Sequence, residues 1–288
     1  MIELHADDLS LELCPEIGGS VRSLSFRDIN LLRRKPDDLN DPDPRDMAAF
    51  PMVPFVGRIR HGAFNWHGQH IQLPANMPPE PHAIHGFGWQ SNWTVEAVDD
   101  RSAVLWHIND GSDWPWSYEA SQTFVLDAQT LLLTLRLINT SSYAMPAGLG
   151  WHPYFPSERA TLYASTQREA LLPNSGRSRS SDVEMIAKAL PNGCEMASVL
   201  VDNVFEISSR DVRITWPTHT LTMTSEPAAN YLTVYSPTGA HYFCAEPITH
   251  IPGAHNLPTP TTGTSLIELS PDEEISLSIM IRFEPSGS

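Results

Sequence analysis

Short runs of alternating apolar and polar residues, joined by turn residues, recur throughout the chain, and long amphipathic helical patterns are nearly absent. Residues 93–108, "WTVEAVDDRSAVLWHI", predict two strands around an Asp-Asp turn, and residues 121–141 predict two more. Three further hairpins are predicted over residues 62–73, 231–247 and 264–283. Hairpins repeated in this way predict an all-β protein, a large antiparallel β-sandwich.

Two stretches interrupt the strand pattern. Residues 36–47, "PDDLNDPDPRDM", are acidic and proline-rich and predict an exposed loop. Residues 173–198 begin as a polar loop and continue into "VEMIAKAL", which predicts one or two helical turns. Strand patterns resume on both sides of each stretch, so neither is typical of a linker between domains. Because 288 residues with 41% hydrophobic content suffice for a large core, residues 1–288 are expected to form a single domain.

The charge balance is strongly acidic, with 18 basic and 34 acidic residues and a net charge of −16. Nucleic acids and anionic membranes attract positive surfaces, so neither is an expected partner. The net charge does not exclude an anionic small ligand, because one arginine can outweigh the overall charge inside a pocket. No segment approaches the ~20 apolar residues of a membrane helix.

The cysteines and the first residues of the chain bear on its compartment. Cys14, Cys194 and Cys244 are odd in number and widely spaced, which favours free thiols in a reducing compartment. The opening segment, "MIELHADDLSLEL", has acidic residues where a signal peptide has basic ones. We therefore expect a cytoplasmic protein.

Two motifs place histidines among glycines and aromatic residues: "HAIHGFGW" at 82–89 and "GLGWHPYFP" at 148–156. Glycine permits close backbone approach, and an aromatic face such as that of Trp89 can pack against the C–H face of a sugar ring. Pro153 restricts His152 to extended conformations and so holds its imidazole rigidly. With an ordinary pKa of ~6.5, His152 and His85 can exchange protons near neutrality, although each could equally be a structural histidine.

Three further side chains are candidates for chemistry. Glu246 ends an apolar strand in "YFCAEPITHIPGAHNLP", where partial burial would make it a better base than a solvated loop glutamate. Asp202, in "VLVDNVFE", could bind hydroxyls or cap a turn. Arg58, in "VGRIRHGAF", offers a fork of donors, and on a strand Arg60 would share its face.

Other catalytic patterns have little support. The H-A-I-H spacing of the first motif could supply metal ligands together with His152, but the sequence contains no cupin-like H-x-H pattern with a following glutamate and no HExxH. The G-x-S-x-G, GxGxxG and Walker patterns are also absent. The residues alone therefore give metal binding little support without excluding it.

Taken in order, the motifs resemble those of the aldose 1-epimerase (galactose mutarotase) family. The matching segments are "EIGGSVRSLSFRDINLL", "GRIRHGAFNWHGQHIQLPAN", "IHGFGW", "GLGWHPYFP", "VDNVFE" and "CAEPITHIPGAHN", from about residue 16 to residue 256. Each string is weak alone, whereas their order and spacing make a specific pattern. The resemblance implies the family fold, the galactose mutarotase-like supersandwich, which agrees with the hairpin pattern.

The resemblance also implies roles for the candidate residues. Glu246 takes the base role toward the anomeric hydroxyl of a sugar, and His152 the acid role toward the ring oxygen. His85 holds or polarises the ring oxygen, while Arg58 and Asp202 bind hydroxyls. The expected partner is a small-molecule sugar, no metal or organic cofactor is required, and the protein is expected to be a monomer or homodimer.

The chain departs from the usual family pattern beside both histidines. Pro153 follows His152, where the family commonly has Thr or Ser, and Pro156-Ser157 replaces Asn-Leu. Gly86-Phe87 follows His85, where the family usually has two glycines. These changes leave the acid–base pair intact and alter the pocket walls. The resemblance therefore indicates a divergent branch of the family, and it does not specify which sugar the protein binds.

The sequence thus predicts an enzyme that interconverts the α and β anomers of a free aldose by ring opening and reclosure. In a first alternative the sugar carries a phosphate or sulfonate, met by Arg58 and Arg60 or by Arg177 and Arg179. A second alternative is a non-catalytic carbohydrate-binding protein, for which Glu246 need not lie near His152. A third is a polysaccharide-cleaving enzyme on a related supersandwich.

Overall fold

A computed structural model describes residues 1–34, 43–170, 181–226, 229–261 and 263–286. Antiparallel strands dominate it: seventeen belong to one continuous sheet, and six more form three two-stranded pairs. The described part has one α-helix, α1 (Ser181–Ala189), at the place where the sequence predicts helical turns. No helix among these residues has the length and apolarity to cross a membrane. The predicted all-β class is confirmed.

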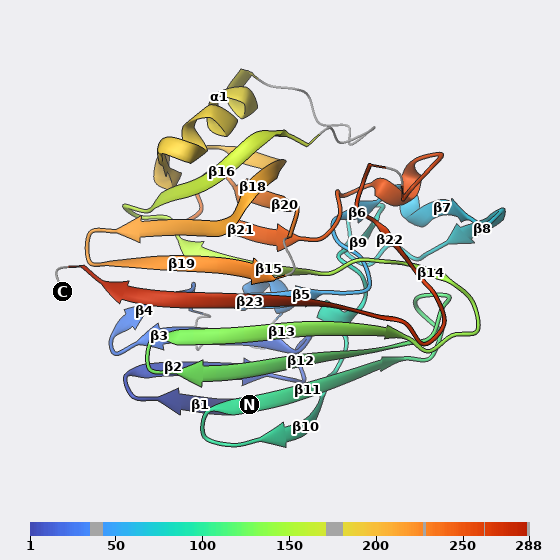
Figure 1. Cartoon of the computed structure of the whole chain (residues 1–288), viewed down its shortest axis with the longest axis horizontal. Coiled ribbons are helices and arrows are strands. Elements are labelled where there is room, and N and C mark those ends of the chain that lie inside the picture. The colour runs from blue at the N-terminus through green and yellow to red at the C-terminus, as the bar shows by residue number, and fades with distance from the viewer. Residues whose placement is uncertain (35–42, 171–180, 227–228, 262, 287–288) are drawn as a thin grey trace.

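The continuous sheet folds into two runs of strands. The first run contains β10 (Thr94–Val98), β11 (Ser102–Asn109), β12 (Tyr118–Asp127), β13 (Thr130–Asn139), β23 (Glu274–Pro285) and β19 (His219–Glu226). The second run contains β1 (Ile2–Ala6), β2 (Leu9–Cys14), β3 (Ser20–Phe26), β4 (Ile29–Asn30), β5 (Ala49–Met52), β15 (Gly150–Pro156), β21 (Tyr242–Ile248) and β20 (Tyr231–Ser236). In Figure 1 the green strands β12 and β13 pass in front of the blue strands of the second run.

One long strand, β18 (Val201–Trp216), joins the two runs. Its residues 201–206 pair with β20, and its residues 211–216 pair with β19. β16 (Thr161–Glu169) pairs with β18 over both parts and also with β17 (Cys194–Glu195), and α1 packs on β16. The sheet can therefore turn from one layer into the other without a break in its hydrogen bonding.

The core lies between the layers and follows the period of two that the sequence predicts. Along β13 and β23 alternate side chains are buried, each exposing 3% or less. They are Leu131, Leu133, Leu135 and Leu137 on β13, and Leu277, Ile279, Ile281 and Phe283 on β23. These residues belong to one cluster with Leu11, Leu13, Val21 and Leu24 of β2 and β3. Each such side chain contributes roughly 1.5–3 kcal/mol by burial, so this alternation holds the layers together.

Four of the five predicted hairpins are confirmed. β10 pairs with β11, β12 with β13, β20 with β21, and β7 (Ala63–Trp66) with β8 (Gln69–Gln72). The fifth prediction, over residues 264–283, is wrong as a hairpin, because β22 (Ile267–Leu269) pairs with β14 (Met145–Ala147) and not with β23. Asn139, at the end of β13, explains the difference. Its N–H donates to Glu273, its carbonyl accepts from Asp272, and its side chain donates to the Leu269 carbonyl.

The predicted exposed loop at 36–47 is described only from residue 43. Asp43 caps a short 3-10 helix, η1 (Pro44–Asp46), and Met47 after it is fully buried. The first part of the segment predicted as a polar loop, residues 173–180, lies outside the described residues. Cys14, Cys194 and Cys244 are free, as their number and spacing predict, and all three are buried.

Candidate functional site

Neighbouring strands β5, β15, β21, β20 and β18 supply the floor of a pocket of about 1440 Å³. Because alternate residues of a strand share a face, the register decides which side chains meet there. β15 pairs His152 with Phe50 of β5, and β20 pairs Thr233 with Glu246 of β21. The six candidate residues named from the sequence all line this pocket: Arg58, His85, Trp89, His152, Asp202 and Glu246.

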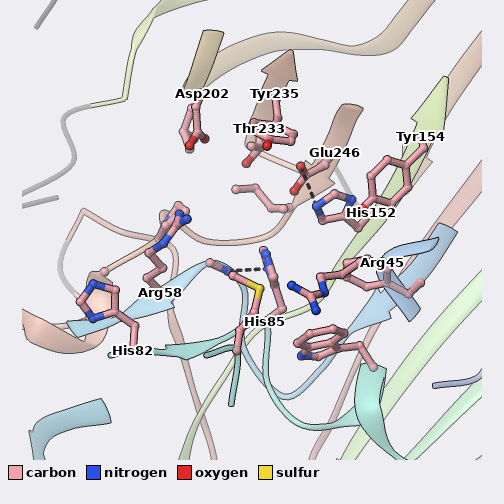
Figure 2. Close-up of a pocket in the computed structure, with 18 of the residues that line it drawn as sticks. Arg45, Arg58, His82, His85, His152, Tyr154, Asp202, Thr233, Tyr235 and Glu246 are labelled. Atoms are coloured by element: carbon pink, nitrogen blue, oxygen red, sulfur yellow. Dashed lines mark hydrogen bonds and ion pairs between the residues drawn. The ribbon is translucent and has the colours of Figure 1, made fainter. Parts of the chain in front are cut away.

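His152 and Glu246 form a buried polar contact in the pocket. Nε2 of His152 lies 3.3 Å from Oε1 of Glu246, and the two residues expose 7% and 2% of their surface (Figure 2). Tyr154 pairs with Cys244, and Gly150 pairs with Ile248, in the register between β15 and β21. Counting inward from both pairs puts His152 and Glu246 directly opposite each other, so strand register brings the two groups together.

Aromatic rings surround the His152 imidazole. The ring of Phe50 stacks on it with centroids 4.4 Å apart, and the ring of Tyr154 does so at 4.7 Å. Nδ1 of His152 is buried and meets no hydrogen-bond partner within the described residues. The imidazole therefore has one polar neighbour of consequence, the Glu246 carboxylate at its Nε2.

Burial determines the protonation of this pair. Burial, with a smaller contribution from the Arg33 guanidinium, lowers the pKa of His152 to about 3, so the imidazole is neutral. Burial disfavours the charged form of a carboxylate as well as that of an imidazole. A buried histidine and a carboxylate in contact are coupled, so their protons are lost in steps that belong to the pair and not to either residue. Such a pair can act as acid at one atom and as base at another.

His85 reaches the pocket from a left-handed backbone position just after β9 (Ala83–Ile84), with φ 61°. Its N–H donates to the Gly57 carbonyl at 2.8 Å, and the Gly57 N–H donates to its Nδ1 at 3.3 Å. An Nδ1 that accepts a hydrogen bond leaves the ring proton of a neutral imidazole on Nε2. The ring of His85 lies 5.4 Å from that of His152 and perpendicular to it, and it points into the pocket (Figure 2).

Trp89, in the 3-10 helix η3 (Gly88–Gln90), supports this segment. Its indole N–H donates to the carbonyls of Ile84 and Gly86, the residues on either side of His85. Its ring stacks on Phe50 with centroids 5.3 Å apart. Trp89 borders the pocket but exposes none of its surface, so its contacts are with the segment that carries His85.

Arg58 and Asp202 line the pocket away from His152, on β6 (Arg58–Ile59) and β18 (Figure 2). The condition under which Arg58 and Arg60 would share a face is not met, because β6 ends at Ile59 and Arg60 begins the 3-10 helix η2 (Arg60–Gly62). Both arginines nevertheless line the pocket. Arg177 and Arg179 lie outside the described residues.

Sequence reasoning missed several residues of the wall. Thr233 and Tyr235 point into the pocket from β20, where they occupy alternate positions on either side of Val234. That alternation was a signal that could have found them. Arg33 and Arg45 also line the pocket, and nothing in their local sequence marks them. The wall as a whole carries four arginines and four carboxylates: Arg33, Arg45, Arg58, Arg60, Asp43, Asp46, Asp202 and Glu246.

One group of side chains in the described residues offers metal-ligand atoms close together. The ligand atoms of His152, Cys244 and Glu246 lie within 4.8 Å of one another, and all three residues are buried. His152 and Glu246 already contact each other. Burial and the adjacent Glu246 raise the pKa of the Cys244 thiol well above its ordinary value, so the sulfur stays protonated and is a poor ligand. The chemistry of this donor set favours an acid–base pair beside a thiol.

Gly148, the first glycine of the "GLGWHPYFP" motif, makes room for a second buried histidine, His250. His250 donates from Nδ1 to the Ile251 carbonyl at 2.8 Å and accepts the Val56 N–H at Nε2, at 3.2 Å. A Cβ on Gly148 would lie 1.9 Å from Cδ2 of His250, so only glycine leaves room for the ring. Through the Val56 N–H, His250 in turn holds the loop that leads to Gly57 and Arg58.

Comparison with known proteins finds relatives in sequence and in structure. The model of the aldose 1-epimerase family matches residues 1–282. The uncharacterized protein YphB of Escherichia coli K12 is 30% identical over 250 residues, which cover 83% of this chain and 84% of that protein. A putative aldose 1-epimerase from E. coli K12 superposes with a TM-score of 0.86 at 26% identity, over 98% of both chains. A galactose mutarotase-like protein from Clostridium acetobutylicum, at 20% identity, has a TM-score of 0.84 over 98% of this chain and 94% of that one.

Proposed function

The chain belongs to the aldose 1-epimerase family, and from that premise we propose that it interconverts the α and β anomers of a free aldose. The observation that carries the proposal is the buried contact between His152 and Glu246 at the floor of the pocket. Anomer exchange needs one group to remove a proton from the C1 hydroxyl and one to deliver a proton to the ring oxygen. A pair that shares a single proton supplies both.

The proposed reaction starts when the C1 hydroxyl of the sugar donates to Glu246. This hydrogen bond favours the carboxylate and leaves the shared proton on Nε2 of His152. Glu246 then takes the hydroxyl proton while His152 protonates the ring oxygen, and the bond between C1 and the ring oxygen breaks to give the open aldehyde. Rotation about C1–C2 presents the other carbonyl face, and reversal of both transfers closes the opposite anomer.

The other wall residues have roles in binding in this proposal. His85 presents Nε2–H toward the ring oxygen, a role supported by the hydrogen bond from Gly57 to its Nδ1. Arg58 and Asp202 bind sugar hydroxyls, with the donor fork of the arginine complementing the acceptor oxygens of the aspartate. Trp89 keeps His85 in place from behind.

The distance between the proposed acid and base weighs against a purely carbohydrate-binding role. A binding protein needs hydroxyl partners but no acid–base pair, and a separation of more than ~7 Å would have favoured it, since both groups must reach one sugar ring. The separation here is 3.3 Å, in a buried setting. Binding residues alone have no requirement for this geometry.

The test is NMR saturation exchange between the anomeric protons of a panel of free aldoses. We expect exchange in at least one aldose to be accelerated by the wild-type protein, with Glu246→Gln and His152→Asn slower by ~10²–10⁴-fold. Circular dichroism confirms that each variant is folded. Wild-type rates in either folded variant, or no acceleration across the panel, would overturn the proposal.

A second candidate keeps the reaction and changes the sugar to one with a phosphate or sulfonate at C6. Arg58 and Arg60 both line the pocket, and two guanidinium groups suit an anion. Arg60→Gln then raises KM for the 6-phosphate sugar about tenfold or more and leaves KM for the neutral sugar unchanged. Equal KM values for the two sugars in the wild type would exclude this candidate.

A further inference from the structure

Arg33 occupies an unusual place at the edge of the pocket floor. Its guanidinium carbon lies 3.8 Å from the ring centroid of Tyr154 and 4.7 Å from that of Tyr242. The guanidinium also donates to the carbonyls of Arg45 and Met47, and the backbone N–H of Arg33 donates to the Tyr154 carbonyl at 2.7 Å. Arg33 therefore contacts Tyr154 twice, by a backbone hydrogen bond and by a cation–π contact of its side chain.

Tyr154 connects Arg33 to the proposed acid. Its ring stacks on the His152 imidazole at 4.7 Å with 29° between the planes, and it exposes only 5% of its surface. A cation on one aromatic ring orders that ring, and in a buried stack the ordered ring restricts its neighbour. Arg33, Tyr154 and His152 thus form a continuous series of contacts that ends at Glu246.

The charge of Arg33 has to be compared with those of the titratable groups that face His152. Glu246 and Cys244 face it from β21, Tyr154 from its own strand, and His85 from the segment after β9. The thiol and the phenol are neutral, because burial raises the pKa of each well above its ordinary value.

Two arginines also lie on this side of the pocket, and they differ in their partners. Arg45 pairs with Asp43 through hydrogen bonds of 2.8 Å. The Arg33 guanidinium donates to the Arg45 and Met47 carbonyls and hydrogen-bonds to Tyr242, and among the described residues it forms no ion pair with a carboxylate. Within the described part of the chain, the positive charge of Arg33 thus has no carboxylate in ion-pair contact, whereas that of Arg45 does.

We propose that Arg33 is a positioning residue for the proposed anomer exchange: through Tyr154 it holds the His152 imidazole at Glu246 and makes the imidazolium a stronger proton donor. The inference rests on the proposed function. A fixed positive charge disfavours a second one nearby, so the proton on His152 transfers more readily to the ring oxygen. The direction in which Arg33 moves the pKa of His152, downward, agrees with this.

The test replaces Arg33 with glutamine, which removes the charge but keeps an amide donor for the two carbonyls. Arg33→Lys keeps the charge and loses the flat stacking group. Arg34→Gln is the matched control, because Arg34 is the adjacent arginine and pairs with Glu12 instead. If Arg33→Gln does not fold, Arg33→Met carries the same test with an apolar chain of similar length.

Two readouts separate this inference from the function on which it rests. The first is the pH titration of the His152 ring by NMR in the sugar-free protein, assigned with His152→Asn. The second is the pH profile of kcat. In Arg33→Gln we expect the midpoint at which the pair loses its shared proton, and the alkaline limb of kcat, to move up by about one pH unit. We expect kcat below that limb to fall about tenfold, while Arg33→Lys and Arg34→Gln keep the wild-type midpoint.

The outcomes that overturn the inference differ from those that overturn the function. An active wild type with an unmoved NMR midpoint and an unmoved kcat profile in Arg33→Gln overturns the role of Arg33 and leaves the function standing. A shift of equal size in Arg34→Gln overturns it too, because the effect is then one of net charge. A wild type without mutarotase activity overturns the function, whatever the NMR midpoints show.

Discussion

Nε2 of His152 and Oε1 of Glu246 lie 3.3 Å apart because β15 and β21 run antiparallel in a register that places the two residues opposite each other. Strand register is stiff, since a slip by one residue would turn both side chains to the other face of the sheet. The same register brings Phe50 beside His152 and Thr233 beside Glu246. The proposed acid–base pair is therefore held by the sheet itself and not by a loop.

A double variant measures whether the pair acts as a unit. Glu246→Gln and His152→Gln each reduce anomer exchange by ~10²–10⁴-fold, and the double variant is expected to be no slower than the slower single variant. One proton cannot be shared once either partner is gone. NMR exchange rates of the four proteins, with the exposed Glu3→Gln as control, give the coupling. Losses that multiply would show that the two groups act independently.

Two replacements of His85 are expected to separate stability from activity. Asparagine tolerates the left-handed backbone at this position and offers an acceptor to the Gly57 N–H, but its side chain stops short of the Nε2 position. Glutamine reaches that position with a donor and is strained by ~1–2 kcal/mol at positive φ. His85→Asn should thus have the higher melting temperature of the two variants, whereas His85→Gln should have the higher kcat. We expect kcat of His85→Asn to be lower than that of the wild type by ~10²-fold. The same order in both measurements would contradict the assigned tautomer.

The unfolding free energy is expected to decrease as pH falls below about 6.5. Burial lowers the pKa of His250 from 6.5 to about 4, so between these values the unfolded chain binds a proton that the folded chain does not. More protons on the unfolded state mean that stability rises with pH, by about 1.4 kcal/mol per pH unit for this histidine. The contribution of His250 to the stability of the fold is fully present above pH 6.5 and is lost progressively as the pH falls toward 4.

Urea denaturation at pH 7 and pH 5 checks this expectation. His250→Gln should be less stable at pH 7, but the loss between pH 7 and pH 5 should be smaller by ~2 kcal/mol than in the wild type. The exposed His5→Gln is the control, with an unchanged loss. An equal loss in wild type and His250→Gln would show that His250 is not kept neutral by the fold.

Two alanine substitutions test the close approach at Gly148. A methyl group there would meet the His250 ring, which two hydrogen bonds hold in place, so Gly148→Ala should cost about 1–3 kcal/mol or more and slow the reaction. Gly239 has φ 73° and open space around it, so Gly239→Ala should cost ~1–2 kcal/mol through backbone strain and leave kcat unchanged. Chemical denaturation and exchange rates measured on both variants distinguish packing from strain.

Much of the fold could be predicted from local sequence, because strand alternation and turn residues are short-range properties. The hairpins β10–β11, β12–β13, β20–β21 and β7–β8 follow from stretches of fewer than twenty-five residues. The pairing of β22 could not be predicted in this way. Asn139, far from it in sequence, holds the turn before β23 through contacts with Leu269, Asp272 and Glu273.

The sequence by itself determined which side chains are candidates, since histidine, glutamate and arginine in glycine- and aromatic-rich motifs are chemically distinctive. Only the tertiary structure decided how they act. It buried Trp89 behind His85, although the motif alone suggests that the Trp89 ring contacts the sugar. It also brought Arg33 onto Tyr154, although nothing near Arg33 in the sequence marks it. Protonation and position depend on burial and on neighbours across the sheet, and these are set by long-range strand pairing, which local sequence does not encode.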